Sequence, residues 1–242
     1  MKRTAACALC ALILMSMAVT SGSGQTAQDI LSKMIDAMGG RKALQAVRDT
    51  TISGSVEVAQ YGLTAAITMY QKEPNKIRMD IDVMGMVITQ GFDGQTGWFT
   101  DPQTGTTQEM PEAQSREFAR QAMGNDVLLD PGKFGVTFAL KPREHVGGRE
   151  HLVLEQTLAD GHMITYFIDP DTHLPFKTKT RATGPAGVEV DSETFLSDYR
   201  KVGNVMIAHS IRNVQDGIEA MRLTVTKVAA NSSLDDALFS MK

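Results

Sequence analysis

Few side chains in this sequence have the types and spacing that catalysis requires. Cys7 and Cys10 form a C-x-x-C pair, which in a cytosolic protein would suggest redox chemistry. Both cysteines lie inside an apolar stretch near the N-terminus, so we interpret their spacing as accidental. The sequence contains no G-x-S-x-G, no H-E-x-x-H and no phosphate-binding glycine loop. We therefore expect a protein that is not an enzyme and that needs no cofactor.

The histidines are the residues that could gather around a metal ion. His145 and His151 flank a Gly-Gly turn, and His162 could join them as a zinc ligand. Histidines at hairpin ends are usually solvated, so we expect no metal site there. His209 alternates with apolar residues, and we interpret it as a hydrogen-bonded core histidine rather than a catalyst or pH switch.

Methionine is the residue type whose placement suggests ligand binding. Residues 76–88 read KIRMDIDVMGMVI, and alternate positions separate into an apolar and a charged face, as in a half-buried strand. Because Met is unbranched and adaptable, a Met-bearing face could fill gaps in a closed core or line a cavity for varied greasy ligands. We favour the cavity. Trp98 would line it, and the alternative role for Trp98 is to anchor its own strand. The expected lining is Ile67, Met69, Met79, Ile81, Met86, Ile88, Trp98, Ile207, Met221 and Leu223.

The first 23 residues have the composition of a secretory signal peptide. Lys2 and Arg3 precede an apolar run over residues 5–19, and a run of small residues follows at 20–24. The apolar run is shorter than the roughly 20 residues that a membrane-spanning helix needs, although a retained anchor is the alternative. Removing this segment leaves 22 basic and 28 acidic residues, a net charge of −6, without a basic stripe. We expect an exported domain over residues 24–242 that does not bind nucleic acid.

The elements that must position these residues begin with helices and continue with strands. Apolar residues recur at helical spacing over 26–38, and a shorter helix is expected at 41–47. Alternation then dominates, interrupted by a helix at 111–123 that directs Phe118 and Ala122 toward the sheet. We count about eleven antiparallel strands. Because a long sheet curls, the predicted class is α+β, an unclosed half-barrel with short helices covering its concave apolar face.

Turn lengths predict how neighbouring strands pair. Apolar residues face one another in the pairs Val58 with Ala65, Met69 with Met79, Ile81 with Ile88, and Ile211 with Met221. In a hairpin around residues 184–186, opposite charges fix the alignment and indicate a wet face. The predicted charge pairs are Lys177 with Glu193, Lys179 with Asp191, and Arg181 with Glu189.

Several segments resemble the periplasmic lipoprotein-carrier (LolA-like) superfamily. KEPNKIRMD at 72–80 is similar to its strand entry, FDGQTGWFTDPQTGT at 92–106 to its D-G-x-x-x-W segment, and residues 168–178 and 195–211 to its later strand-turn pieces. Thr100 departs from the pattern, which usually has an aromatic residue there. The family's ligand-contacting arginine has no counterpart, because Arg78 falls on the wet face. The resemblance implies an unclosed barrel that holds an acyl chain in the periplasm of a Gram-negative bacterium.

Two functions remain open at this point. The first is a periplasmic carrier or sensor for lipid or lipoprotein acyl chains, with membrane-bound donor or acceptor proteins as further partners. The second is a protein-interaction or envelope-sensing module on the same half-barrel, in which the apolar face is a closed core. Lipid that co-purifies with the mature protein would distinguish them, and the identity of the cargo stays open.

Overall fold

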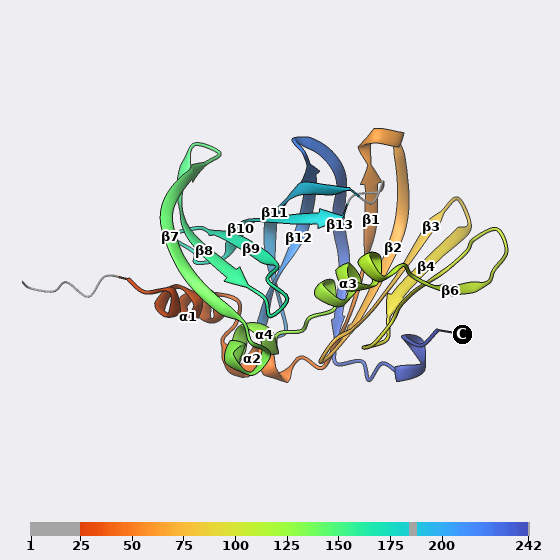
Figure 1. Ribbon diagram of the computed structural model, residues 1–242, viewed down its shortest axis with the longest axis horizontal. Coiled ribbons are helices and arrows are strands. Elements are labelled where there is room, and N and C mark those ends of the chain that lie inside the picture. The colour runs from red at the N-terminus through yellow and green to blue at the C-terminus, as the bar shows by residue number, and fades with distance from the viewer. Residues whose placement is uncertain (1–24, 184–187, 242) are drawn as a thin grey trace, which may run out of the picture.

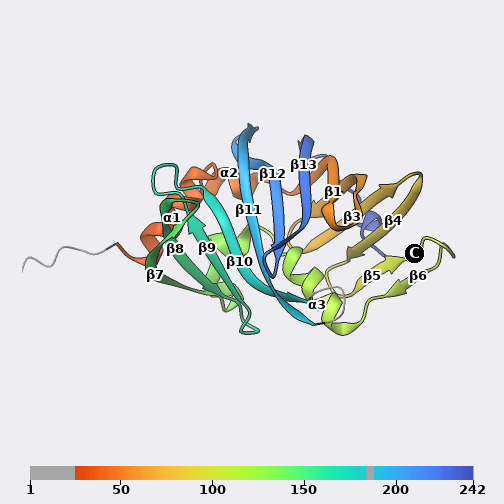
Figure 2. The same ribbon diagram turned by 90° about the horizontal axis from the view of Figure 1, so that it is seen from above.

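The computed structural model describes residues 25–183 and 188–241, and the expected signal peptide and the turn at 184–186 lie outside that part. Thirteen strands form one antiparallel sheet, ordered β6-β5-β4-β3-β2-β1-β13-β12-β11-β10-β9-β8-β7. The sheet curls without closing, and helices lie in its hollow (Figures 1 and 2). The predicted class is confirmed, but the count of eleven strands is wrong. The strands at Gly97–Thr100 and Thr107–Glu109 have only four and three residues. Strands this short do not show a recognisable alternation of apolar and polar residues.

The bounds of the elements follow the sequence pattern closely. The strands are β1 Asp49–Val58, β2 Leu63–Lys72, β3 Lys76–Val83, β4 Met86–Phe92, β5 Gly97–Thr100, β6 Thr107–Glu109, β7 Thr137–Val146, β8 Arg149–Thr157, β9 Met163–Ile168, β10 Pro175–Thr183, β11 Glu189–Val202, β12 Val205–Gln215 and β13 Ile218–Ala230. The helices are α1 Ala27–Ala37, α2 Arg41–Ala46, α3 Glu112–Gln121 and α4 Asp126–Leu129, and the 3₁₀ turns are η1 Ala59–Tyr61, η2 Pro131–Phe134 and η3 Asp236–Leu238.

Helix α1 begins and ends where its capping residues predict. The Thr26 hydroxyl accepts a hydrogen bond from the Asp29 amide, and the Asp29 carboxylate accepts one from the Thr26 amide, which is a capping box. At the other end Gly39 has φ of 125°, and a Cβ there would lie 2.3 Å from the Asn204 carbonyl oxygen. Glycine therefore lets the helix stop against the β11–β12 turn.

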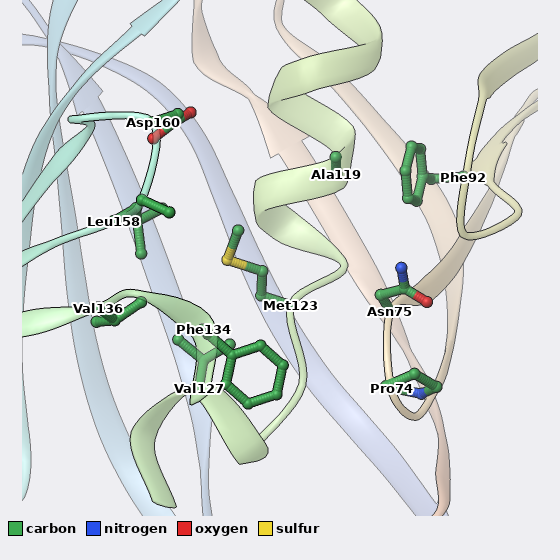
Figure 3. A pocket seen from close by; sticks show the side chains of 11 residues that line it. Pro74, Asn75, Phe92, Ala119, Met123, Val127, Phe134, Val136, Leu158 and Asp160 are labelled. Carbon is green, nitrogen blue, oxygen red and sulfur yellow. The ribbon is translucent and has the colours of Figure 1, made fainter. Parts of the chain in front are cut away.

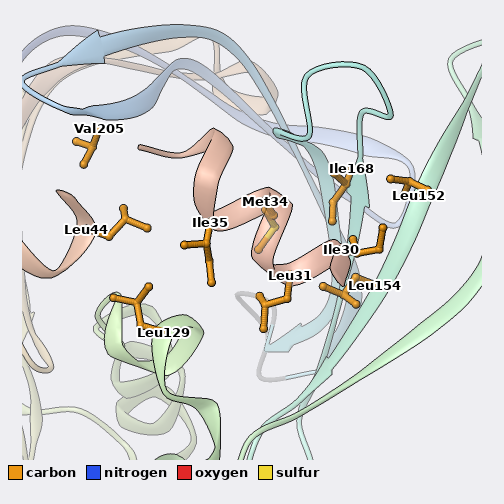
Figure 4. Packing of buried hydrophobic residues seen from close by; sticks show 10 residues of the cluster. All are labelled: Ile30, Leu31, Met34, Ile35, Leu44, Leu129, Leu152, Leu154, Ile168 and Val205. Carbon is orange, nitrogen blue, oxygen red and sulfur yellow. The ribbon is translucent and has the colours of Figure 1, made fainter. Parts of the chain in front are cut away.

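The apolar face of α1 forms the core at one end of the sheet. Four of its side chains are buried there together with residues from α2, α4 and strands β8, β9 and β12. Burying one such aliphatic side chain contributes about 1.5–3 kcal/mol, so this contact fixes α1 on the sheet. The buried members of the cluster are Ile30, Leu31, Met34, Ile35, Leu44, Leu129, Leu152, Leu154, Ile168 and Val205 (Figure 4).

Helix α3 covers the other end of the concave face, as the sequence predicts. Phe118 and Ala122 are buried against Ile77 of β3 and Phe92 of β4. The helix approaches β5 closely because Gly97 has no side chain, and the Gly97 amide donates a 2.7 Å hydrogen bond to the Ser115 hydroxyl. Helices α1 and α3 therefore pack against the sheet through two separate clusters of apolar side chains.

Two of the predicted strand registers are confirmed and two are wrong by two residues. Met69 pairs with Met79, and Ile81 pairs with Ile88. Val58 instead pairs with Leu63, because a four-residue loop containing η1 replaces the expected two-residue turn. Ile211 pairs with Leu223, since a bulge follows the β12–β13 turn. A shift of two keeps every side chain on its predicted face.

The hairpin of opposite charges has the predicted ion pairs but a different register. Lys179 lies opposite Glu193, two residues from the predicted alignment. The charges still meet diagonally, with N–O distances of 2.7 Å for Lys177–Glu193, 3.6 Å for Lys179–Asp191 and 3.5 Å for Arg181–Glu189. Lys177 also corrects the expectation of a wet face. It is buried, with its ammonium 4.1 Å from the centre of the Phe167 ring.

The convex face of β2–β5 is covered by residues 231–241, which we call the C-terminal strap. Asp49 accepts hydrogen bonds from three successive strap amides, those of residues 232–234. Lys72 and Lys76 bind the Asp236 carboxylate at 2.8 and 2.9 Å and hold its pKa at about 2. Arg78 donates to the Leu238 carbonyl oxygen at 3.1 Å, so the face predicted to be wet is partly covered.

Candidate functional site

The concave face of β1, β2 and β13 is a continuous apolar surface, which we call the concave cluster. Its buried members are Val56, Ala65, Ile67, Leu223 and Val225, and half-buried residues including Met69, Ile81 and Met221 surround them. The structure therefore brings together five of the ten residues predicted to line a cavity: Ile67, Met69, Ile81, Met221 and Leu223.

The other predicted lining residues on the concave side are spread over the sheet. Met79 is half-buried under α3, in the cluster of Ile77 and Phe92. Ile207 packs beside α1 at the opposite end. Met86 is exposed and Ile88 is half-buried, both on β4 toward the β3–β4 turn. Met79 and Ile88 still pair directly with Met69 and Ile81, so the apolar surface of the concave cluster continues toward them, whereas Ile207 belongs to the α1 cluster.

Trp98 is on the opposite face of the sheet, so its interpretation as a cavity residue does not fit its position. It pairs with Gly91, which alternates with Phe92 on the concave side. A Cβ at Gly91 would meet the indole at 2.9 Å, and the indole N–H donates a 2.7 Å hydrogen bond to the Phe239 carbonyl oxygen. Trp98 and Phe239 are both buried, so Trp98 anchors the C-terminal strap.

A pocket of about 390 Å³ lies between the sheet and the segment 112–134, which contains α3, α4 and η2 and which we call the lid segment. Figure 3 shows side chains from both halves of the sheet directed at this space from opposite sides. The wall is mostly apolar. It is formed by Pro74, Asn75, Phe92, Ala119, Met123, Val127, Phe134, Val136, Leu158, Ala159 and Asp160.

The lid segment is held by polar contacts at its middle and its end. The Gly124 amide donates to the Pro74 carbonyl oxygen at 3.1 Å, and the Asn125 amide donates to the Glu73 carboxylate at 2.9 Å. Arg41 binds Asp130 at 3.2 Å and also donates to the Leu129 carbonyl oxygen. The lid segment is therefore attached to the β2–β3 turn on one side and to α2 on the other.

A smaller pocket of about 170 Å³ adjoins the first on the side of β8 and β9. Met123, Val127 and Leu158 line both pockets, so these side chains stand between the two spaces. Met123 is partly exposed and is unbranched, which lets it change rotamer at low cost.

The polar groups near the pockets are few and mostly paired. Arg120 binds Asp160 at 2.8 Å and Glu117 at 3.4 Å, so its charge is balanced. Burial acts to raise the pKa of Asp160, but hydrogen bonds from the His162 amide and from Arg120 outweigh it and lower the pKa. The Tyr166 hydroxyl donates to Gln156 at 2.8 Å, and burial raises its pKa to about 12. These groups are therefore bound to one another in and beside the pocket walls.

Glu73 is the polar residue with an unusual environment beside the lid segment. One carboxylate oxygen accepts from the Asn125 amide, while the other is buried without a partner. Burial raises the pKa of Glu73, because the charged form loses contact with water. A Cβ at Gly124 would lie 1.7 Å from the unpartnered oxygen, so Gly124 makes this approach possible.

The histidines are placed apart rather than around a common point. His151 is buried and stacks on Phe176 with the ring centres 4.7 Å apart, while His162 lies 2.7 Å from the Thr180 hydroxyl. His209 is buried, and its Nδ1 lies 2.9 Å from the Ile207 carbonyl oxygen, which confirms a hydrogen-bonded core histidine. Across residues 25–183 and 188–241, no three His, Cys, Asp or Glu side chains are placed to hold a metal.

Sequence reasoning missed the pocket, because none of the ten predicted residues lines it. Seven of its eleven wall residues come from short pieces after α3, where neither a period of two nor a period of 3.6 is sustained. Phe134 and Met123 are partly exposed large apolar residues, a feature of a binding surface that the structure shows and the sequence does not. Phe134 and Met123 share a pocket with Phe92 and Leu158 because the sheet curls. The alternation of apolar and polar residues does not specify that curl.

Comparisons with known proteins identify the fold. No protein-family sequence model matches the chain, and no curated protein matches it in sequence. A crystal structure of an outer membrane lipoprotein-sorting protein domain from Vibrio parahaemolyticus matches with a TM-score of 0.62 and 15% identity, over 88% of this chain and 97% of that chain. A LolA superfamily protein from Nitrosomonas europaea matches with a TM-score of 0.59 and 14% identity, over 89% and 97%.

A third structure of similar likeness is a DUF1329 family protein from Desulfovibrio piger. Its TM-score is 0.62 and its identity 13%, over 88% of this chain and 97% of that chain. The resemblance found in the sequence is therefore confirmed at the level of the fold, which is that of LolA superfamily structures. None of the described helices is long and apolar enough to cross a membrane.

Proposed function

We propose that this protein is a non-enzymatic carrier that holds an acyl chain of a lipid or lipoprotein in the pocket under the lid segment. The observation that carries the proposal is the apolar pocket of about 390 Å³ between the lid segment and the sheet. This volume is in the range of about 300–1,000 Å³ that is usual for small-ligand sites. The smaller space behind Met123 could lengthen the site for a longer chain.

The chemistry of the wall supports an apolar chain as the ligand. Phe92, Met123, Phe134 and Leu158 offer aromatic and aliphatic contacts, while Asn75 and Asp160 provide the polar groups. Transfer of each CH₂ group from water contributes about 0.8 kcal/mol, so even part of an acyl chain would bind measurably. A carrier must also release its ligand, and a wall with a movable Met suits a chain that exchanges.

The expected cellular location of the protein also supports the proposal. The signal-like N-terminal segment supports export, and the matched fold occurs in a domain named for outer membrane lipoprotein sorting. We therefore place the protein in the periplasm of a Gram-negative bacterium, where membrane-bound donor and acceptor proteins would be its further partners. The LolA-like fold itself hosts different tasks, so the pocket carries the functional argument.

Filling the pocket tests this proposal directly. Ala119 lies on the pocket side of α3, and Ala113 is exposed on the same helix. We expect Ala119→Trp to weaken binding of a fluorescent acyl probe at least about tenfold, because an indole occupies the ligand's space. Ala113→Trp should change the affinity less than about twofold, and both variants should be folded by circular dichroism.

A different outcome would favour the second function. If the wild-type protein ignores the acyl probe and mass spectrometry finds no co-purifying lipid, the pocket is not a lipid site. That result would favour the protein-interaction or envelope-sensing module over the carrier. Equal binding by the wild type and Ala119→Trp would also contradict the pocket as the place where the chain binds.

A further inference from the structure

Large apolar side chains are exposed at the ends of three hairpins, which together we call the lip. Met84, at the β3–β4 turn, is 96% exposed, and Tyr61 and Ile218 occupy the β1–β2 and β12–β13 turns. Six of the twelve exposed large apolar side chains within the described ranges belong to the lip. They are Tyr61, Leu63, Met84, Met86, Val87 and Ile218.

The strand order places these three turns at one end of the sheet. Strands β4, β3, β2, β1, β13 and β12 are consecutive neighbours, and each of the three turns joins two of them at the same end. Figure 1 shows the β1–β2 and β12–β13 hairpin ends along the upper edge of the half-barrel and the β3–β4 hairpin end farther to the right. Five strand spacings separate the outer two strands, so the lip is roughly 24 Å wide.

The lip continues the apolar surface of the hollow. Leu63 pairs with Val58 and Met86 pairs with Val83, and both valines pack against the concave cluster. Farther down β3 and β4 the surface reaches Phe92, which also lines the pocket. Apolar side chains therefore extend from the exposed turns to the pocket wall.

The charge around the lip indicates which surface it can meet. Residues 57–64, 82–88 and 215–219 contain four acidic residues, Glu57, Asp82, Asp216 and Glu219, and no basic residue. Arg212 and Arg222 on the adjoining strands pair with Glu219 at 3.8 and 2.9 Å, so the net charge around the lip is −2. An anionic membrane would repel this charge, since like charges raise the free energy of approach. The apolar side chains stand on three separate turns, an arrangement that suits insertion into a bilayer interface better than contact with a single peptide or helix.

We propose that the lip inserts into the interface of a lipid bilayer with electroneutral headgroups. Tyr, Met and Ile on short turns can enter the boundary between headgroups and acyl chains, to a depth of about 5–10 Å. The acidic residues remain in water and keep the protein from anionic lipid. If the proposed carrier function holds, the hollow then opens toward the membrane that supplies or receives the acyl chain.

Vesicle flotation tests the lip without assuming that the pocket binds lipid. The triple variant Tyr61→Ser, Met84→Ser, Ile218→Ser removes three lip side chains, and Leu140→Ser, Met163→Ser, Met241→Ser removes three that are exposed elsewhere. We expect the wild type and the control to float with phosphatidylcholine vesicles, and to bind less when phosphatidylglycerol is added. The lip variant should partition roughly 1,000-fold more weakly, since each of the three side chains contributes about tenfold.

A second measurement reports insertion itself. In Met84→Trp the new indole should shift to shorter emission wavelength when phosphatidylcholine vesicles are added, while buried Trp98 provides a constant background. Wild-type protein that ignores phosphatidylcholine vesicles, equal flotation of the lip variant, or preference for anionic vesicles would overturn the proposal. The lip variant should still bind a soluble acyl probe normally, so failure of lip binding and failure of the carrier function are distinguished.

Discussion

Trp98 shows at the scale of one residue why the candidate site was only partly predictable. Its type suited a cavity lining, but β5 has four residues, and so short a strand does not reveal which face each side chain takes. The partner that explains Trp98 is Phe239, 141 residues away in the sequence. The concave residues Ile67 and Met69 were predictable because β2 is long enough to show a period of two.

Glu73 should make the stability of the protein depend on pH in a recognisable way. Burial raises its pKa above the ordinary value of 4.5, so the folded state binds a proton more readily than the unfolded state. The stability contributed by this residue is therefore full below about pH 4.5 and is lost as pH rises through the folded-state pKa.

The variant Glu73→Gln measures this effect because it cannot titrate. We expect the free energy of unfolding of the wild type, relative to the variant, to fall as pH rises above about 4.5. Denaturant unfolding at a series of pH values gives the difference directly. A difference that increases with pH would mean that the Asn125 amide stabilises the charged carboxylate more than burial destabilises it.

At the scale of elements, the junction between α3 and α4 depends on a glycine. A methyl group at Gly124 would lie 1.7 Å from Glu73, whereas one at Gly132 meets nothing within 4 Å. We expect Gly124→Ala to cost about 1–3 kcal/mol of stability, because the Glu73 carboxylate must move away and give up its hydrogen bond with the Asn125 amide. Gly132→Ala should be neutral or stabilising by up to about 1 kcal/mol.

The same pair of variants connects the lid segment to ligand binding. If Gly124→Ala displaces the lid segment, the affinity for an acyl probe should change while Gly132→Ala leaves it unaltered. Chemical denaturation and probe titration on both variants check the prediction. Equal stability of the two variants would show that the Glu73 side chain moves aside without cost.

Elements and their faces were predictable from the sequence, while loop geometry was not. The Thr26 cap, the turn at Glu73–Asn75 and the faces of β3 and β4 follow from local rules, and each is confirmed. The β1–β2 register was wrong because η1 adds residues to the loop, and the β12–β13 register because of a bulge. The length of the loop and the presence of a bulge are features of the backbone conformation, and the pattern of apolar and polar residues does not specify them.

At the scale of the whole molecule, the two halves of the sheet meet where β1 pairs with β13. Gly54 lies at a bulge in this pairing, and a Cβ there would be 2.2 Å from the Thr224 carbonyl oxygen. We expect Gly54→Ala to cost at least about 1–3 kcal/mol, because the two strands must separate locally. The unfolding midpoint should fall by the same amount with both probes. Trp98 fluorescence reports the half of the sheet that contains β5, and far-UV circular dichroism reports the entire sheet.

The control for this variant is again Gly132→Ala. If the halves unfold independently, Trp98 fluorescence and circular dichroism will give different midpoints in Gly54→Ala. Coincident midpoints, both lowered, would mean that the sheet unfolds as one cooperative unit.

The β1–β13 pairing also has a consequence in time. Thr50 pairs with Ala230, so one edge of β1 is not fully paired until the ribosome has made 180 further residues. At about 5–20 residues per second this takes on the order of 10–30 s. Pairing across such a sequence separation is slow to form, because a long loop must close first. The chain thus remains incompletely folded throughout its synthesis, which is the condition in which a polypeptide can still be threaded across a membrane.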